Sequence, residues 1–217
     1  MTRPSRGERD PIVPMTAFEE AAYAQGYQRI AGIDEVGRGT LAGPVAAAVV
    51  LFPPGTVISG LKDSKQLSPQ DREGLYPMIL EKAVAVAVGM VDAAVIDRIN
   101  ILQATRLAMQ KAVEQLTVQP DYLLLDAITL PRVPIPQRPI IKGDQLSVSI
   151  AAASIVAKVT RDRLMARYHE EYPQYNFLSH KGYGTVEHRD LIRIHGPCEI
   201  HRKTFRGVCD ADRLFSV

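Results

Sequence analysis

Two adjacent carboxylates, Asp34 and Glu35, follow an apolar run and form the first candidate for a chemical site. A glycine-rich turn comes directly after them, in which Gly37 and Gly39 flank Arg38. Because glycine has no Cβ, the backbone of this turn can approach a phosphate closely while the guanidinium binds the phosphate oxygens. A charged β-turn between two hairpin strands has the same composition. This stretch by itself leaves both interpretations open.

Two further acids, Asp126 and Asp144, also follow short apolar runs. Ligands commonly bind beyond the carboxyl ends of strands in α/β sheets, so Asp34, Asp126 and Asp144 are expected to form one cluster. Adjacent side chains in a regular strand point to opposite faces, and Glu35 therefore joins Asp34 only if the strand ends or bulges there. Crowded carboxylates need raised pKa values or a cation between them, and Mg²⁺ and Mn²⁺ prefer oxygen ligands. A solvated turn is the alternative for each acid taken alone.

The composition places few limits on function. With 217 residues, of which 46% are hydrophobic, the chain can form one substantial core. The formal net charge of +2 gives no global field that would attract nucleic acid, so binding of nucleic acid would depend on local basic patches. Cys198 and Cys209 make no disulfide framework, and no N-terminal run resembles a signal peptide. The cysteines and the N-terminal sequence favour a reducing cytoplasm. No apolar run approaches the roughly 18 residues that span a membrane, so we expect a soluble protein. We also expect a monomer.

The elements that position the acids begin after residues 1–14, whose three prolines and mixed charges predict a disordered tail ahead of a single domain at 15–217. Thr16 and Glu19 have the spacing of a capping box and predict a short leading helix. Three apolar, partly β-branched runs then predict a meander of strands over 28–33, 45–52 and 84–91.

Helices alternate with strands in the rest of the chain. Ser68 caps a predicted helix that runs to about Lys82, with a kink or an early end at Pro77. Helical spacing predicts further helices over 92–96, 101–116 and 147–172, and one near 186–194 in a C-terminal part that starts at about residue 176. Short strands are predicted at 122–125 and 139–142. This alternation indicates an α/β fold with helices on the faces of a mixed sheet.

Seven ordered motifs give the chain a resemblance to the ribonuclease HII family over about residues 26–208. The motifs are IDEVGRG at 33–39, DSKQL at 63–67, Leu125–Asp126, KGD at 142–144, AASIVAK at 152–158, HKGYGT at 180–185 and HRKTF at 201–205. The resemblance implies a ribonuclease H-like fold, with a five-stranded mixed sheet flanked by helices and a helical C-terminal extension.

The resemblance also implies a metal-dependent endonuclease that hydrolyses the RNA strand of RNA/DNA hybrids. Such a chain would cut 5′ of ribonucleotides embedded in duplex DNA, in ribonucleotide removal during DNA replication and repair. The catalytic and metal-binding residues would be Asp34, Glu35, Asp126 and Asp144, with Mg²⁺ or Mn²⁺ as the cofactor. The implied substrate-binding residues are Gly37, Arg38, Gly39, Lys65, Lys181 and Tyr183, with Tyr183 packed on the sugar that follows the ribonucleotide. A sliding clamp is a further partner to consider.

General chemistry supports the same mechanism. Two ions about 4 Å apart can activate a water on one side of a phosphodiester and stabilise the leaving oxygen on the other. The products would carry 3′-hydroxyl and 5′-phosphate ends. Selectivity for RNA has to come through the 2′-hydroxyl, and backbone groups left accessible by Gly37 and Gly39 can hydrogen-bond to it.

The histidines and cysteines near the C-terminus suggest two other interpretations. A structural zinc site is one of them, with a hydrogen-bonded loop as the plainer alternative, and its ligands would be His195, Cys198, His201 and Cys209. Histidine-driven RNA cleavage through the 2′-hydroxyl is the other. That mechanism would leave the four acids without a role.

Two alternatives keep the nucleic acid but change the function. A non-catalytic hybrid-binding protein would use basic residues such as Arg38, Lys142 and Lys158, but it would place acids where phosphates should dock. A resolvase-like nuclease with the same fold is the nearest enzyme alternative. The glycine-arginine-glycine turn distinguishes the chain from such nucleases.

Overall fold

The first three strands form the predicted antiparallel meander. They are β1 (Ile30–Val36), β2 (Val45–Leu51) and β3 (Ala85–Val91) in the computed structural model, which describes residues 15–61 and 64–209. β2 is buried along its whole length, which fits its continuous run of alanine, valine and leucine. β2 is thus the central strand of the meander, with β1 and β3 on either side.

Two parallel strands complete the sheet beside β1. They are β4 (Tyr122–Asp126) and β5 (Gln137–Ile140), and the strand order is β3-β2-β1-β4-β5. β4 pairs with β1 up to Ile33 and Leu125, one residue before the first acid of each strand. The five-stranded mixed sheet confirms the predicted fold class, and its parallel strands end at one edge.

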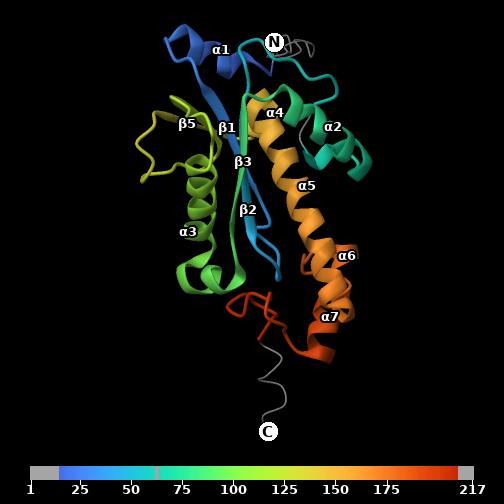
Figure 1. Ribbon diagram of the computed structural model, residues 1–217. Coiled ribbons are helices and arrows are strands. Elements are labelled where there is room, and N and C mark those ends of the chain that lie inside the picture. The colour runs from blue at the N-terminus through green and yellow to red at the C-terminus, as the bar shows by residue number, and fades with distance from the viewer. Residues whose placement is uncertain (1–14, 62–63, 210–217) are drawn as a thin grey trace, which may run out of the picture.

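Helices cover both faces of the sheet (Figure 1). α3 (Ala93–Glu114) lies on one face, while α5 (Val148–Glu171) and α2 (Pro69–Lys82) lie on the other, after the short helix η1 (Ser64–Gln66). α3 bends at Asn100, which has a positive φ of 65° and whose side chain accepts from the N–H groups of Leu102 and Gln103. This bend separates the two helical stretches that the sequence predicted.

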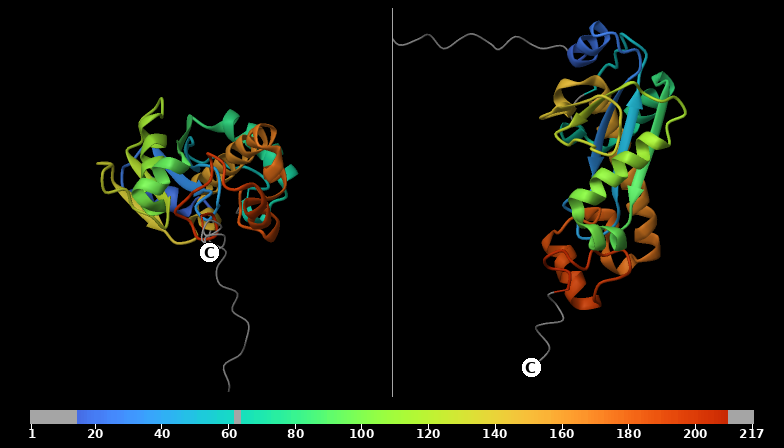
Figure 2. Two further views of the ribbon diagram at one scale, coloured as in Figure 1. Left: turned by 90° about the horizontal axis from the view of Figure 1, so that it is seen from below. Right: turned by 90° about the vertical axis from the view of Figure 1, so that its left-hand side faces the viewer.

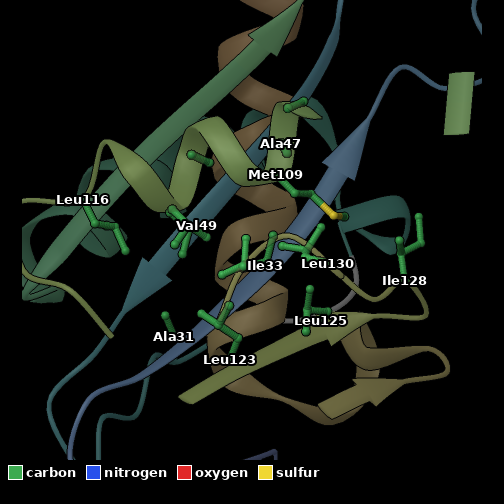
Figure 3. Packing of buried hydrophobic residues seen from close by; sticks show 14 of the residues in the cluster. Ala31, Ile33, Ala47, Val49, Met109, Leu116, Leu123, Leu125, Ile128 and Leu130 are labelled. Atoms are coloured by element: carbon green, nitrogen blue, oxygen red, sulfur yellow. The ribbon is translucent and has the colours of Figure 1, made fainter. Parts of the chain in front are cut away.

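The larger core lies between the sheet and α3. Figure 3 shows Ile33, Val49 and Leu125 of the sheet packed with Met109 of α3 and with Leu116, just beyond the end of that helix. All five side chains are buried. Burying one such side chain stabilises the folded state by about 1.5–3 kcal/mol. The core layer therefore fixes the strands whose ends carry the acids.

The remaining helices lie at the two ends of the sheet. α1 (Ala17–Ala24) is at one end, and α4 (Gly143–Leu146) leads into α5. η2 (Pro173–Tyr175), α6 (Phe177–His180) and α7 (Val186–His195) form a C-terminal part beyond the opposite end of the sheet (Figure 2). No helix in the described ranges is long and apolar enough to cross a membrane. The predicted tail at 1–14 lies outside the described residues.

Isolated bridges attach the C-terminal part to the turn between β1 and β2. Thr40 pairs with Tyr183, and Ala42 pairs with His201. The backbone N–H of Leu41 donates to the carbonyl of Gly182 at 2.8 Å. The C-terminal extension therefore builds one wall around the glycine-rich turn.

Three predictions of local structure differ, wholly or in part, from the structure. β1 continues to Val36 in regular register with β2, so Asp34 and Glu35 lie inside the strand without a bulge. The helix α2 runs to Lys82 as predicted and does not end early at Pro77. Because Pro77 is exposed, water can bind the helix carbonyl that loses its N–H donor at this residue. Thr16 makes no side-chain cap, because its hydroxyl donates to Oε1 of Glu20 at 2.6 Å. The buried carboxylate of Glu19 accepts hydrogen bonds from Ser147 and Ser149 at the start of α5 and so does not complete the capping box.

Gly32 sets the distance between β1 and α5. A Cβ at this position would lie 2.6 Å from the Cβ of Ser149 and would collide with the backbone of Ser149 and Ile150. The helix can therefore lie directly against the strand only because residue 32 has no side chain. This contact brings the middle of α5 to the acidic end of β1.

Candidate active site

Three of the four predicted acids converge at the carboxyl ends of the parallel strands. One ligand oxygen from each of Asp34, Asp126 and Asp144 lies within 4.8 Å of the other two. Asp34 is on β1, Asp126 ends β4, and Asp144 is in α4, just after β5. Asp34 and Asp144 are buried, with 5% and 2% of their surface exposed. Within the described ranges, this is the one group of acids, histidines or cysteines that fits a metal ion.

Strand register and one hydrogen bond hold the cluster together. Because Ile33 pairs with Leu125, the next residues of the two parallel strands, Asp34 and Asp126, lie side by side. The Oδ1 atom of Asp126 accepts a hydrogen bond from the N–H of Gly143 at 2.9 Å. This contact joins the end of β4 to the start of α4, which carries Asp144.

The carboxyl of Asp34 is strongly perturbed. Burial raises its pKa well above the usual range, and the neighbouring Glu35 charge raises it further, while a side-chain hydrogen bond with Ser154 acts in the opposite direction. The N–H of Glu35 also donates to Oδ1 of Asp34 at 2.7 Å. A buried carboxyl that resists ionisation is stabilised in its charged form by a cation, so its environment fits a metal ligand.

Glu35 lies next to this cluster but outside the group of three. Its Oε1 atom accepts from Nη1 of Arg38 at 3.2 Å, whereas its buried Oε2 atom has no hydrogen-bond partner among the described residues. Burial raises the pKa of Glu35, Arg38 opposes this shift, and Asp126 adds to it. A buried carboxylate oxygen without a partner is costly unless a cation approaches it. The four acids therefore fit the divalent metal that the sequence predicted.

A small pocket joins the acids to the predicted substrate contacts. It has a volume of about 90 Å³, and Asp34, Glu35 and Tyr183 line it. The Tyr183 side chain is 40% exposed, and Nζ of Lys158 lies 5.8 Å from the centre of its ring. Arg38 and Gly39 of the glycine-rich turn are exposed on the same loop, while Gly37 is buried beneath them. A flat ring, a flexible cation and the acids thus face one cavity.

The sequence matches known proteins over most of its length. Residues 31–208 match the profile of Ribonuclease HII. The chain belongs to the ribonuclease HII family. The "Ribonuclease HII" of Geobacter sulfurreducens is 55% identical over 201 residues, which cover 93% of each chain.

Solved structures of this family share the fold. The ribonuclease H2 from Pyrococcus horikoshii superposes with a TM-score of 0.74 at 25% identity, over 86% of this chain and 98% of that one. A second match is the "PCNA:RNase HII complex" from Archaeoglobus fulgidus, with a TM-score of 0.64, 26% identity and coverage of 76% and 87%. The chain is thus a ribonuclease H, a hydrolase of the endonuclease class, and this family depends on metal ions.

Other residues of the ribonuclease HII pocket were missed by the sequence analysis as site residues. They are Ser64, Arg72 and Ser154, whereas Lys158 was considered only as a contact of the hybrid-binding alternative. Ser154 and Lys158 are four residues apart on α5 and thus on one face, a signal that was available within the AASIVAK motif. Arg72 gives no such signal, because it reaches the pocket from α2 while its Nη1 atom donates to the carbonyls of Ser64 and Leu67.

Of the two predicted substrate lysines, Lys181 does not line this pocket. Lys65 belongs to η1, and its side chain is outside the described part of the structure. Lys181 lines a neighbouring hollow of about 210 Å³ together with Arg163 and Arg72, and Arg72 also lines the acidic pocket. Glu73, which pairs with Arg163, and Asp162 line the same hollow, so its charge is mixed. Lys181 and Arg72 remain the cations that could contact a nucleic-acid backbone there.

The C-terminal histidines form a packed, hydrogen-bonded cluster. His188 and His201 are joined through their Nε2 atoms at 3.1 Å, and His201 Nδ1 accepts from the N–H of Cys198 at 3.0 Å. Burial lowers the pKa of both rings to about 4, so both are neutral at pH 7. Neither histidine lines the acidic pocket. This arrangement corresponds to the hydrogen-bonded loop and disfavours histidine-driven cleavage.

Proposed function

We propose that this ribonuclease HII-family chain cuts 5′ of a ribonucleotide embedded in duplex DNA, as well as the RNA strand of RNA/DNA hybrids, and leaves 3′-hydroxyl and 5′-phosphate ends. The observation that carries the proposal is the shared pocket, in which Asp34 and Glu35 face Tyr183 and the glycine-rich turn adjoins them. The acids supply a site for phosphodiester hydrolysis, and the turn and ring supply contacts to the sugars.

The catalytic group consists of Asp34, Glu35, Asp126 and Asp144, and these residues would hold Mg²⁺ or Mn²⁺. When bound, the divalent ions supply an activated water and charge stabilisation for the leaving oxygen. Ser154 and the N–H of Gly143 orient the carboxylates of Asp34 and Asp126. Preorganised oxygens of this kind reduce the reorganisation needed when charge develops in the transition state.

The glycine-rich turn and the Tyr183 ring form the substrate side of the site. The exposed backbone around Gly39 can hydrogen-bond to the 2′-hydroxyl, the group that separates RNA from DNA. Tyr183 offers an exposed ring to the following sugar, and a deoxyribose fits there because a second 2′-hydroxyl would face the ring without a partner. Lys158, Lys181 and Arg38 lie near enough to this surface to serve phosphates.

One assay tests the proposed reaction. A DNA duplex with a single ribonucleotide is incubated with the protein and Mg²⁺ or Mn²⁺, with and without chelator, and the product ends are identified. We expect metal-dependent cleavage on the 5′ side of the ribonucleotide. Cyclic-phosphate ends, or equal cleavage of an all-DNA duplex, would contradict the proposal.

Replacing Tyr183 by Ala is expected to lower cleavage of the single embedded ribonucleotide by about tenfold, the scale of one lost ring contact. The loss on a continuous RNA/DNA hybrid should be smaller, because the two substrates differ in the sugar that follows the cut. Tyr183→Phe keeps the ring and serves as the matched control, with near wild-type rates on both substrates. Equal losses on both substrates for Tyr183→Ala would argue against the sugar contact.

We also propose that the chain acts as a cytoplasmic monomer and that a sliding clamp is a partner to test. The Archaeoglobus fulgidus relative, solved in a complex with PCNA, supports the clamp as a candidate. Size-exclusion chromatography of the protein alone tests the monomeric state. The same experiment with a purified clamp tests whether the two proteins form a complex.

A further inference from the structure

Two fully buried arginines lie beneath the glycine-rich turn. Arg161 is on α5 and Arg202 is in the C-terminal segment, and both have 0% of their surface exposed. Within the described residues, neither guanidinium forms a salt bridge. Burial lowers the pKa of both arginines, and the charge of Arg161 adds to this effect at Arg202. Two charges without an acidic partner are unusual in a protein interior and call for a role.

The guanidinium of Arg202 binds carbonyl groups of the turn. It donates to the carbonyl oxygens of Gly37 at 2.6 Å, Arg38 at 2.8 Å and Gly43 at 3.0 Å. The peptide bonds of the described chain are trans, so the C=O and N–H of one peptide unit point in opposite directions. Because the carbonyls of Gly37 and Arg38 face Arg202, the N–H groups of Arg38 and Gly39 face away from it, on the exposed side of the turn.

The guanidinium of Arg161 ties this turn to the loop that carries Tyr183. It donates to the carbonyl oxygens of Ala42 and Pro44, both at 3.0 Å, and to that of Lys181 at 2.9 Å. It also donates to the hydroxyl of Thr40 at 3.0 Å, and this hydroxyl in turn donates to the carbonyl of Gly37. One buried side chain therefore holds both substrate-facing loops at a constant separation.

We propose that Arg202, supported by Arg161, is a positioning residue that presents the N–H groups of Arg38 and Gly39 to a phosphate of the substrate. Successive N–H groups that face one side of a turn form an anion-binding concavity. The two buried positive charges behind the turn favour an anion in front of it. Asp162 acts on Arg161 and Asp97 on Arg202, but within the described residues neither acid forms an ion pair with them. This inference rests on the proposed role of the turn in substrate binding.

Binding and cleavage by Arg202→Lys test the inference. Lysine keeps the charge but offers a single flexible donor group, which cannot span three carbonyl oxygens as the planar fork of arginine does. In an Asp126→Asn background, which prevents cleavage, we expect about tenfold or more weaker binding of a fluorescent duplex with one ribonucleotide, the scale of a lost charge-assisted hydrogen bond. In the active protein, KM should rise while kcat changes little. Affinity for Mn²⁺, measured by calorimetry, should stay at the wild-type value.

Two further variants separate positioning from a general loss of stability. Leu116→Ala opens a cavity in the core beyond the far end of α3, so it should lower the melting temperature without changing duplex affinity. Thr40→Val removes only the hydroxyl between Arg161 and Gly37, and we expect a few-fold rise in KM in a folded protein. Thr40→Val also tests the positioning role if Arg202→Lys does not fold.

The outcomes distinguish the inference from the proposed function. Wild-type affinity and KM in folded Arg202→Lys, or in Thr40→Val if the former does not fold, would overturn the positioning role. An equal fall of kcat and Mn²⁺ affinity would overturn it as well, because the arginines would then support the acids. If the wild-type protein itself does not prefer the ribonucleotide-containing duplex over an all-DNA duplex, the proposed function is wrong and the role of Arg202 is not the cause.

Discussion

The Asp126→Asn variant is expected to lose cleavage activity by roughly 100- to 1,000-fold or more, the scale of removing one preorganised electrostatic group. Asn keeps an oxygen that can accept from the N–H of Gly143, so the junction of β4 and α4 should persist while the charge of a metal ligand is lost. The measurement is single-turnover cleavage of the ribonucleotide-containing duplex at saturating Mg²⁺. Unchanged circular dichroism would show that the fold is retained.

Asp121→Asn is the matched control for this prediction. Asp121 directly precedes the same strand, β4, at the end opposite the acidic cluster, and accepts from the N–H groups of Gln28 and Arg29. The substitution is chemically identical, so it should leave the cleavage rate unchanged. Activity of Asp126→Asn within a few-fold of wild type would remove the basis for the metal assignment.

Asp34→Asn should abolish cleavage in the same way and should also raise the melting temperature of the metal-free protein. The folded-state pKa of Asp34 is raised, chiefly by burial and by the charge of Glu35. Its contribution to stability is therefore fully present below the unfolded pKa and is lost as the pH rises through the folded pKa. The gain from Asn should thus be largest at alkaline pH and disappear below about pH 4. Melting curves at several pH values, recorded with chelator, measure it.

Gly37→Ala is expected to be far more damaging than Gly39→Ala, although both glycines flank Arg38. Gly37 has a φ of +85°, and a Cβ there would collide with Nε of Arg161 and lie 2.8 Å from its Cδ and 2.9 Å from the carbonyl of Pro44. Left-handed strain and overpacking together should cost about 2–5 kcal/mol of folding free energy. Displacement of the turn should lower cleavage by about 100-fold, since small misplacements of binding groups have effects of that size.

Gly39→Ala tests the substrate contact without this strain. A Cβ at Gly39 meets no described atom within 4 Å, and its φ lies outside the left-handed region. The melting temperature should therefore stay at the wild-type value, with a change in folding free energy of less than about 0.5 kcal/mol. Weaker cleavage with unchanged Mn²⁺ affinity would show that the new methyl group meets the substrate. An unaltered cleavage rate would rule out close approach at this position.

The sequence by itself determined the chemistry and the elements that carry it. Two adjacent acids after an apolar run, further acids after two other runs, and the glycine-arginine-glycine turn are local patterns that can be read along the chain. Strand and helix periods are local as well, and the predicted meander, long helices and α/β class were confirmed. The capping box predicted at Thr16 does not form, because the Thr16 hydroxyl donates to Glu20 and the distant Ser147 and Ser149 bind the carboxylate of Glu19.

Only the tertiary structure decided which residues meet. The side-by-side placement of Asp34 and Asp126 depends on the register of Ile33 against Leu125, which no local pattern specifies. The buried Arg202 contacts Gly37 from 165 positions away. A charged side chain in the sequence predicts a solvated surface, because burying its charge is costly. The cost of burying Arg202 is offset by carbonyl groups of the glycine-rich turn that point toward its guanidinium. These carbonyls take up that orientation only when the chain has folded, so the sequence does not reveal the contact.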